Sequence, residues 1–228
     1  PDFIPEDVPV AMADISDLKM TIVTNDPTKR YYYTLLFDDK YRVKIATRNI
    51  NIPGVQNFRD LGGYPSYSTK KQMRWGMIYR SAEIDSLECS SRRELKNLGI
   101  KTLIDLRASS EIGRQSPLQK GFNVVHIPLA TGDMEDILKG IREEKIKCDT
   151  VYRMVERMNR VLIDQYTKEY RQIFDILLDK NSYPVVIHCS SGKGRTGIVS
   201  ALVLAALGIN EDIIMEDYRL SNDYFNIP

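Results

Sequence analysis

The side chains with the clearest chemistry lie together in one run, from His188 to Gly197, which reads HCSSGKGRTG. The run follows a short apolar stretch that ends at His188 and precedes a longer one that continues to Leu207. It is therefore predicted to connect a buried strand to a helix. Such a loop brings several backbone N–H groups and the positive end of the helix dipole to one place. The run predicts a binding site for an anion of the size of phosphate.

Within this run, Cys189 is the candidate nucleophile, because the positive field of the loop favours its thiolate form. Arg195 stands at the start of the predicted helix, where its planar guanidinium can hold two phosphate oxygens. Attack of the thiolate on phosphorus would form a phosphocysteine, which water then hydrolyses. His188 could fix the loop or stabilise the thiolate, and Thr196 could donate its hydroxyl to the sulfur as it leaves.

Two other phosphate or sulfur chemistries are compatible with a glycine-rich loop between a strand and a helix. A Walker loop is excluded, because no G-x-x-x-x-G-K-[ST] occurs in the chain. A sulfur-transfer loop of the rhodanese kind remains an alternative, although it usually has one residue fewer between its cysteine and its arginine.

The surrounding elements predict an α/β fold with a central, mostly parallel sheet flanked by helices. Further strands are expected at 101–106 and 123–128, and a helix is expected to open with a capping box at Ser91 and to close at Gly99. Another helix is expected at 211–220, behind Asn210. In such sheets ligands bind at the carboxyl ends of the strands, where the run from His188 would lie.

The chain is expected to consist of a small antiparallel β appendage over 1–50 and a main domain over 51–228. The appendage would be formed by three β-rich runs at 21–24, 31–37 and 41–46. Apolar residues recur with helical spacing between about 136 and 180, which predicts a long helical insertion. This insertion could be a lid over the site or a solvated pair of surface helices.

Composition excludes several classes of function. The 32 Lys and Arg residues balance 31 Asp and Glu, so a nucleic-acid partner is not expected. The longest uncharged apolar run, 197–209, is too short for a transmembrane segment. Three cysteines without a C-x-x-C and two histidines favour neither a metal site nor a cofactor.

The run from His188 to Gly197 resembles the signature of the cysteine-dependent phosphatases, the protein tyrosine phosphatases in the broad sense. The remaining motifs resemble a bacterial branch of that family, which includes a secreted mycobacterial enzyme. They are NFRDLGGY at 57–64, WG at 75–76, YRS at 79–81, IDLR at 104–107, HIP at 126–128, YR at 170–171 and DYRLSND at 217–223.

The resemblance implies Cys189 as nucleophile and Arg195 as the clamp on phosphate, with the backbone of Ser190, Ser191, Gly192, Lys193 and Gly194 as a cradle for a phosphate ion. It also implies that the Lys193 side chain is a second cationic contact and that Asp105 lies close to the substrate. GKGR at 192–195 further resembles the loop of a phosphoinositide-phosphatase tumour suppressor, which leaves lipid headgroups open as substrates.

One position departs from the pattern of the branch. The branch usually carries Asp directly before the loop arginine, as the presumed general acid, and this chain has Gly194 there. Because a leaving alkoxide or phenoxide needs a proton, the role is expected to move to Asp133, with Asp136 and Asp105 as alternatives. Asp133 could instead only cap the following helix.

The sequence therefore predicts a metal-independent hydrolase of phosphate monoesters, with phosphotyrosine in proteins as the favoured substrate and phosphoinositide or dual-specificity activity as the alternative. A function of a different class is a weakly active module that only binds phosphorylated ligands. The habits of the family and the absence of an initial Met suggest export, or attachment to the envelope of a bacterial cell.

Overall fold

The computed structural model describes residues 9–14, 16–17, 19–24, 29–37, 41–84, 89–112, 121–130, 140, 143 and 148–226. The chain divides into two compact units, one ending at Tyr31 and one beginning at Tyr32. In the first unit, the strand predicted at 21–24 is wrong: these residues have no strand assignment, and Val23 is 86% exposed. β-propensity alone does not form a strand where the backbone has no ladder partner.

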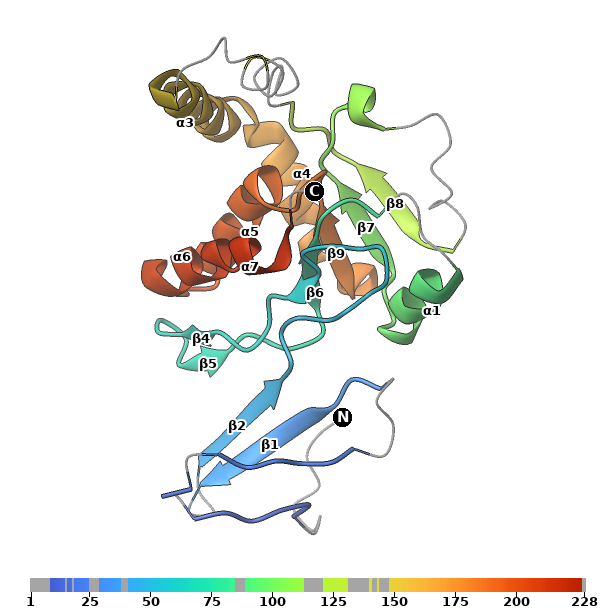
Figure 1. The fold of residues 1–228 in the computed structure, drawn as a ribbon, viewed down its shortest axis with the longest axis vertical. Helices are drawn as coiled ribbons and strands as arrows, with labels where there is room; N and C mark the ends of the chain where they lie inside the picture. Colours follow the sequence, from blue (N-terminus) through green and yellow to red (C-terminus); the bar gives the residue numbers. More distant parts are fainter. Residues whose placement is uncertain are drawn as a thin grey trace. The chain divides into compact units, whose positions relative to one another are not determined.

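The second unit contains a five-stranded sheet in the order β3 (Arg59–Asp60), β6 (Ile78–Ser81), β9 (Val185–His188), β7 (Thr102–Asp105) and β8 (Asn123–His126). β3 pairs antiparallel with β6, and the other neighbours are parallel. The prediction of a mostly parallel sheet is confirmed. β9 is the central strand, so the residues that follow it leave the sheet in the middle of its carboxyl edge (Figure 1).

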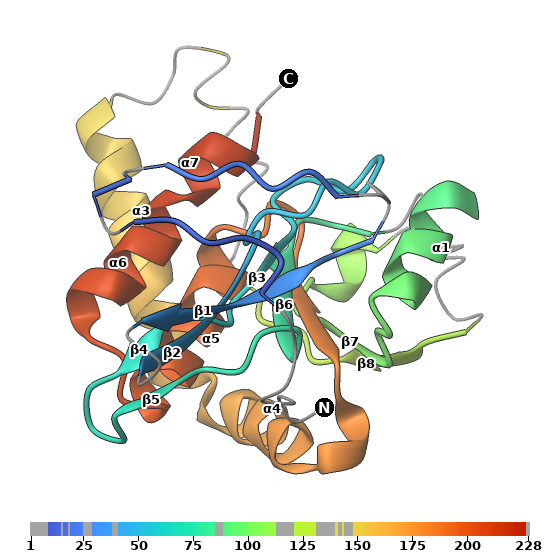
Figure 2. The ribbon, with the colours of Figure 1, turned by 90° about the horizontal axis from the view of Figure 1, so that it is seen from below.

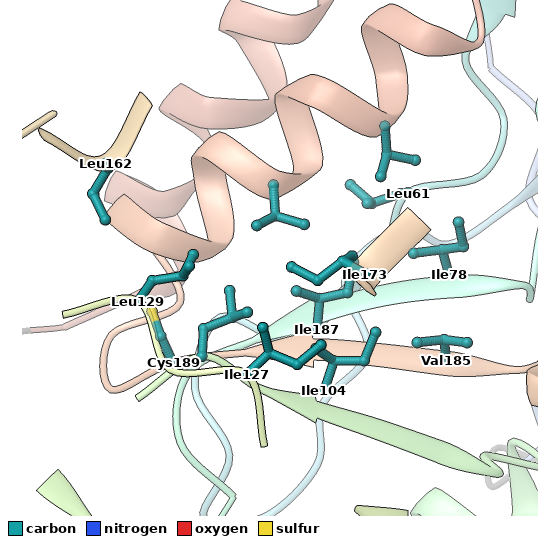
Figure 3. Packing of buried hydrophobic residues seen from close by; sticks show 13 residues of the cluster. Leu61, Ile78, Ile104, Ile127, Leu129, Leu162, Ile173, Val185, Ile187 and Cys189 are labelled. Atoms are coloured by element: carbon teal, nitrogen blue, oxygen red, sulfur yellow. The ribbon is translucent and has the colours of Figure 1, made fainter. Parts of the chain in front are cut away.

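Helices cover both faces of this sheet (Figures 1 and 2). α1 (Cys89–Asn97) lies on one face, where its Leu95 packs with Val186 of β9. α5 (Gly194–Ala206) lies on the other, where its Val199 packs with Ile187 of β9 and with Cys189 (Figure 3). Neighbouring residues of one strand thus enter opposite cores, as expected for a strand buried on both sides.

The remaining helices lie on either side of β9 and α5 in the sequence. They are the 3₁₀ turn η1 (Ser109–Glu111), α3 (Cys148–Gln165), α4 (Thr167–Leu178), the 3₁₀ turn η3 (Lys180–Ser182), α6 (Glu211–Arg219) and α7 (Ser221–Tyr224). α3 and α4 occupy most of the segment predicted to be helical. Leu162 of α3 and Ile173 of α4 are buried in the cluster that contains Cys189, so each helix has one face in the core (Figure 3). No helix of the described residues is long and apolar enough to cross a membrane.

The capping box predicted at Ser91 is wrong. α1 already begins at Cys89, so Ser91 lies inside the helix. Its hydroxyl donates to the Pro53 carbonyl at 2.5 Å, and the residue is fully buried. Ser91 therefore joins α1 to the segment before β3 instead of capping the helix, a long-range bond that local spacing does not reveal.

Two small antiparallel pairs complete the unit: β1 (Tyr32–Phe37) with β2 (Tyr41–Ala46), and β4 (Pro65–Ser66) with β5 (Lys71–Gln72). In the first pair, one face carries only apolar and aromatic side chains. These are Tyr33, Leu35, Phe37, Tyr41, Val43 and Ile45. Two strands alone are marginally stable in water, so contacts with other residues are needed to stabilise the pair.

Arg48, two residues after β2, contacts side chains and carbonyls of the segment 60–75. Its guanidinium lies 3.8 Å from the ring centroid of Tyr64 and 4.9 Å from that of Trp75. Its Nη1 donates to the carbonyls of Asp60 and Gly62 at 2.7 and 2.8 Å, and the Trp75 indole donates to the Lys44 carbonyl at 2.8 Å. Trp75 in turn requires glycine at position 63, which has φ +84° and whose added Cβ would lie 2.0 Å from the indole ring.

We expect Arg48→Ala to lower the free energy of unfolding by about 2 kcal/mol, because two cation–π contacts and two hydrogen bonds to carbonyls are lost together. Urea denaturation followed by tryptophan fluorescence measures this change, since Trp75 is the single tryptophan of the chain. Lys44→Ala is the matched control. It removes a neighbouring cation but keeps the Lys44 carbonyl, so its effect should stay within about 0.5 kcal/mol. Equal effects of the two substitutions would contradict the role of Arg48.

Candidate active site

The reactive run lies where β9 ends and α5 begins. His188 is the last residue of β9, Cys189 follows it, and α5 starts at Gly194, so Arg195 stands in its first turn. Cys189 is 1% exposed and lies in the hydrophobic cluster with Leu129 (Figure 3) and Val199. Arg195 is 8% exposed. The geometry predicted for this run, a loop entering the N-terminus of a helix at the carboxyl edge of the sheet, is what the structure has.

The loop at 190–193 lies directly on the end of β6. Gly192 has φ +67°, and a Cβ added there would lie 2.4 Å from the backbone of Ser81. Only glycine combines this backbone conformation with so close an approach. The backbone of the loop is therefore fixed against the sheet.

Glu111 holds the guanidinium of Arg195 from the side of η1. Its carboxylate accepts from Nη1 of Arg195 at 2.5 Å and from Nη2 at 2.7 Å. It also accepts from the Ser190 hydroxyl at 2.6 Å and from the Ala108 amide at 2.8 Å. Nη2 also donates to the Ser190 hydroxyl at 3.2 Å. Nε takes no part in these contacts, so it is geometrically suited to bind an oxyanion from the side of the guanidinium.

The same contacts shift the pKa values of Glu111 and Arg195. Burial acts to raise the pKa of Glu111, but the hydrogen bonds from Arg195, Ser190 and Ala108 outweigh it and lower this pKa to about 2. Burial also acts against the charge of Arg195, but its hydrogen bonds to Glu111 and the charge of Cys189 raise the pKa of the guanidinium. Both groups are therefore charged over the physiological range of pH.

This pair predicts a loss of stability in acid. The pKa of Glu111 falls from an ordinary 4.5 to about 2 on folding, so its contribution is fully present above pH 4.5 and is lost as the pH falls toward 2. Urea denaturation at a series of pH values in this interval should show a steep fall for the wild type and a shallower one for Glu111→Gln. Equal slopes for the two proteins would contradict the pairing.

Asp105 lies at the end of β7, beside the reactive run, as expected from the sheet. Its carboxylate accepts from Arg107 Nε at 2.9 Å and from Arg107 Nη2 at 2.6 Å, and its Oδ1 lies 3.9 Å from His188 Nδ1. Burial raises the pKa of Asp105, but Arg107 and His188 together lower it below its ordinary value. A carboxylate that is ionised and paired in this way is a poor proton donor.

The other predicted residues have distinct surroundings. Lys193 is half-buried, and its Nζ donates to Asn222 Oδ1 of α7 at 2.7 Å in a solvent-exposed hydrogen bond. Thr196 Oγ1 is buried and has no hydrogen-bond partner among the described residues. Ser191 Oγ lies 3.4 Å from the Lys193 amide. Asp133 and Asp136 lie outside the described residues.

A buried network behind the loop was not predicted. Arg59 Nε and Arg80 Nη1 both donate to the Asp217 carboxylate of α6, at 3.2 and 2.6 Å, and all three residues are at most 1% exposed. Burial raises the pKa of Asp217, but the two arginines outweigh it and lower this pKa. The motifs NFRDLGGY, YRS and DYRLSND contain all three residues, so the resemblance marked these positions without assigning them a role. Among the described residues, no group of three or more possible metal ligands is present.

Comparison with known proteins agrees with this geometry. The model of the tyrosine phosphatase family matches residues 50–227. The triple specificity protein phosphatase PtpB of Mycobacterium tuberculosis is 32% identical over 194 residues, which cover 75% of this chain and 68% of that protein. A putative tyrosine-protein phosphatase of Cupriavidus necator is 29% identical, over 74% of this chain and 61% of that protein.

Solved structures give a weaker likeness. The Siw14 catalytic core is 18% identical, with a TM-score of 0.42 over 62% of this chain and 69% of that chain.

The chain spans about two thirds of the length of the two curated relatives. Because the match of the family model extends over most of the chain and includes the loop with Cys189 and Arg195, the chain belongs to the tyrosine phosphatase family of cysteine-dependent hydrolases.

Proposed function

We propose that this chain hydrolyses phosphotyrosine in proteins through a phosphocysteine intermediate. The observation that carries the proposal is the convergence of Cys189 and Arg195 on the N-terminus of α5, with the Arg195 guanidinium already oriented by Glu111. A module that only binds phosphate needs the cationic loop but has no use for a buried cysteine at its base.

In the proposed reaction, Arg195 and the loop amides bind the phosphoryl oxygens while Cys189 Sγ attacks phosphorus. The bond between phosphorus and the tyrosine oxygen breaks, and this oxygen takes a proton from a general acid. Water then attacks the phosphocysteine, which releases inorganic phosphate and restores the thiolate. The buried hydroxyl of Thr196 is suited to donate a hydrogen bond to the departing sulfur.

Asp133 is the proposed general acid, with Asp136 as the alternative. Asp105, Glu111 and Asp217 each have a pKa lowered by arginine partners. None of these three carboxyls is suited to hold a proton at neutral pH. Gly194 cannot supply the acid either, so the proton has to come from another segment.

We expect Asp133→Ala to lower kcat for a phosphotyrosine peptide about 10²-fold, because the leaving phenoxide is no longer protonated. With an aryl phosphate whose leaving group has a low pKa, the loss should be much smaller. Phosphate release measured on both substrates, in the presence of EDTA, tests this. Asp136→Ala is the matched control and should lose less than about threefold on either substrate. If Asp136→Ala shows the substrate-dependent loss instead, the acid is Asp136.

Phosphoinositide hydrolysis is the second candidate, favoured by the half-buried Lys193 of the loop, whose Nζ makes a solvent-exposed hydrogen bond to Asn222. Its ammonium could bind a second phosphate of a multiply charged headgroup. A panel of a phosphotyrosine peptide, a phosphothreonine peptide and phosphoinositides separates the two substrates. Lys193→Met should lower kcat/KM for the lipids more than for the tyrosine peptide.

A further inference from the structure

Three successive carbonyls of the loop are bound by donors that lie outside it. The Ser190 carbonyl accepts from the Glu83 amide at 3.1 Å. The Ser191 carbonyl accepts from Asn57 Nδ2 at 3.0 Å. The Gly192 carbonyl accepts from Arg80 Nη2 at 2.8 Å. Arg80 belongs to β6, Glu83 follows β6 closely and Asn57 precedes β3, so two separate segments of the sequence bind these three carbonyls.

Fixing a carbonyl also fixes an amide. In a trans peptide, the C=O group and the N–H group of the next residue point in opposite directions. The bonds to the carbonyls of residues 190, 191 and 192 therefore turn the amides of Ser191, Gly192 and Lys193 away from Glu83, Asn57 and Arg80. These amides belong to the cradle in which an oxyanion would be bound. The Lys193 amide donates to Ser191 Oγ at 3.4 Å, a long hydrogen bond that an oxyanion would replace.

The surroundings of Arg80 fix its side chain beside the loop. It is 1% exposed, and its two terminal nitrogens bind different partners, Asp217 through Nη1 and Gly192 through Nη2. Arg59 shares the same Asp217, so two guanidinium groups face one carboxylate. Burial and the charge of Arg59 lower the pKa of Arg80 to about 10, which leaves it charged at neutral pH.

We propose that Arg80 is a positioning residue for the phosphatase reaction: it orients the peptide between Gly192 and Lys193 so that the Lys193 amide can bind the oxyanion, and Asn57 does the same for the Gly192 amide. The proposal rests on the proposed function of the loop. It differs from a purely electrostatic role, in which Arg80 would only add positive charge near Cys189.

Arg80→Lys distinguishes these two roles. Lysine keeps the charge, but a single ammonium bound to Asp217 leaves the Gly192 carbonyl without its donor. We expect tungstate, an oxyanion probe, to bind this variant at least about tenfold more weakly than the wild type, and kcat/KM for a phosphotyrosine peptide to fall about 10²-fold. Isothermal titration calorimetry measures the first quantity and phosphate release the second.

Two further variants complete the experiment. Asn57→Gly keeps the φ of +57° accessible and removes a neutral donor together with the Oδ1 that accepts from Arg59 Nη1. It should also weaken tungstate binding, with no change of charge. Tyr64→Phe is the control: it removes a 3.1 Å hydrogen bond to the same Asp217 without contact to the loop, and should bind tungstate within about threefold of the wild type. Circular dichroism establishes that each variant is folded.

Tungstate affinities of folded Arg80→Lys and Asn57→Gly within about threefold of Tyr64→Phe would overturn the proposal. If Arg80→Lys does not fold, Asn57→Gly alone decides, since it reports on the adjacent peptide. Tungstate binding needs no turnover, so the failure of the proposed function is separate: a wild type that binds tungstate but releases no phosphate contradicts catalysis and leaves the positioning role testable.

Discussion

Cys189→Ser is expected to lower the rate of phosphate release from a phosphotyrosine peptide by more than about 10⁴-fold, which is the largest effect of any substitution considered. A serine hydroxyl is far less acidic than a thiol, so the variant has no anionic nucleophile at this position at neutral pH. The Arg195 guanidinium and the loop amides remain, so the variant should bind the peptide with an affinity close to that of the wild type. Calorimetry with the unhydrolysed peptide measures this affinity.

Cys89→Ser is the matched control, because Cys89 is an exposed residue at the start of α1. Its rate should equal that of the wild type. Turnover that survives in Cys189→Ser would show that another group attacks phosphorus. Loss of peptide binding in a folded Cys189→Ser would show that the thiol is needed for binding itself. If the wild type binds the peptide without turnover, the chain acts as a binding module.

Glu111→Ala is expected to lower kcat about 10³-fold, the second largest effect. Glu111 binds both terminal nitrogens of Arg195 and the hydroxyl of Ser190, so its removal frees two side chains that face the phosphoryl group. A freely rotating arginine no longer meets the transition state with a fixed pair of donors, and the loss of oriented donors costs about 10²–10³ in rate. A small change in KM with a large change in kcat would identify this cause.

Glu156→Ala provides the comparison, since Glu156 also pairs with an arginine, Arg160, but on the exposed surface of α3. We expect no measurable change in its rate. Glu111→Gln should lie between the wild type and Glu111→Ala, because the amide keeps one acceptor for Arg195. A folded Glu111→Ala with the rate of the wild type would refute the orienting role.

The sequence was sufficient to predict three parallel strands of the sheet and the helix that follows β9. The strands at 102–105, 123–126 and 185–188 are apolar runs bounded by polar or turn residues, and only the loop at 189–193 separates β9 from α5. These are local signals, and the rule that ligands bind at the carboxyl edge of parallel strands converts them into a site. The rule predicts Cys189 and Arg195 at this edge, whereas the place of Asp105 near the substrate was implied by the resemblance to the phosphatase family.

Long-range polar contacts could not be predicted in the same way. β6 was missed because its sequence, IYRS, contains an arginine, and Arg59 and Arg80 are each at most 1% exposed. Arginine is normally a surface residue, and only a carboxylate from a distant segment makes its burial favourable. The partners Asp217 and Glu111 are 137 and 84 residues away from the arginines they bind. No local periodicity marks such pairs.

The contacts of Arg48 show that the folded phosphatase domain begins before the first residue of the family match. The match of the family model starts at residue 50, two positions after the guanidinium that covers Tyr64 and Trp75. A fragment cut at that point would expose an indole ring and leave the Asp60 and Gly62 carbonyls to water. In physical terms the domain therefore begins no later than Lys44, whose carbonyl accepts from the Trp75 indole.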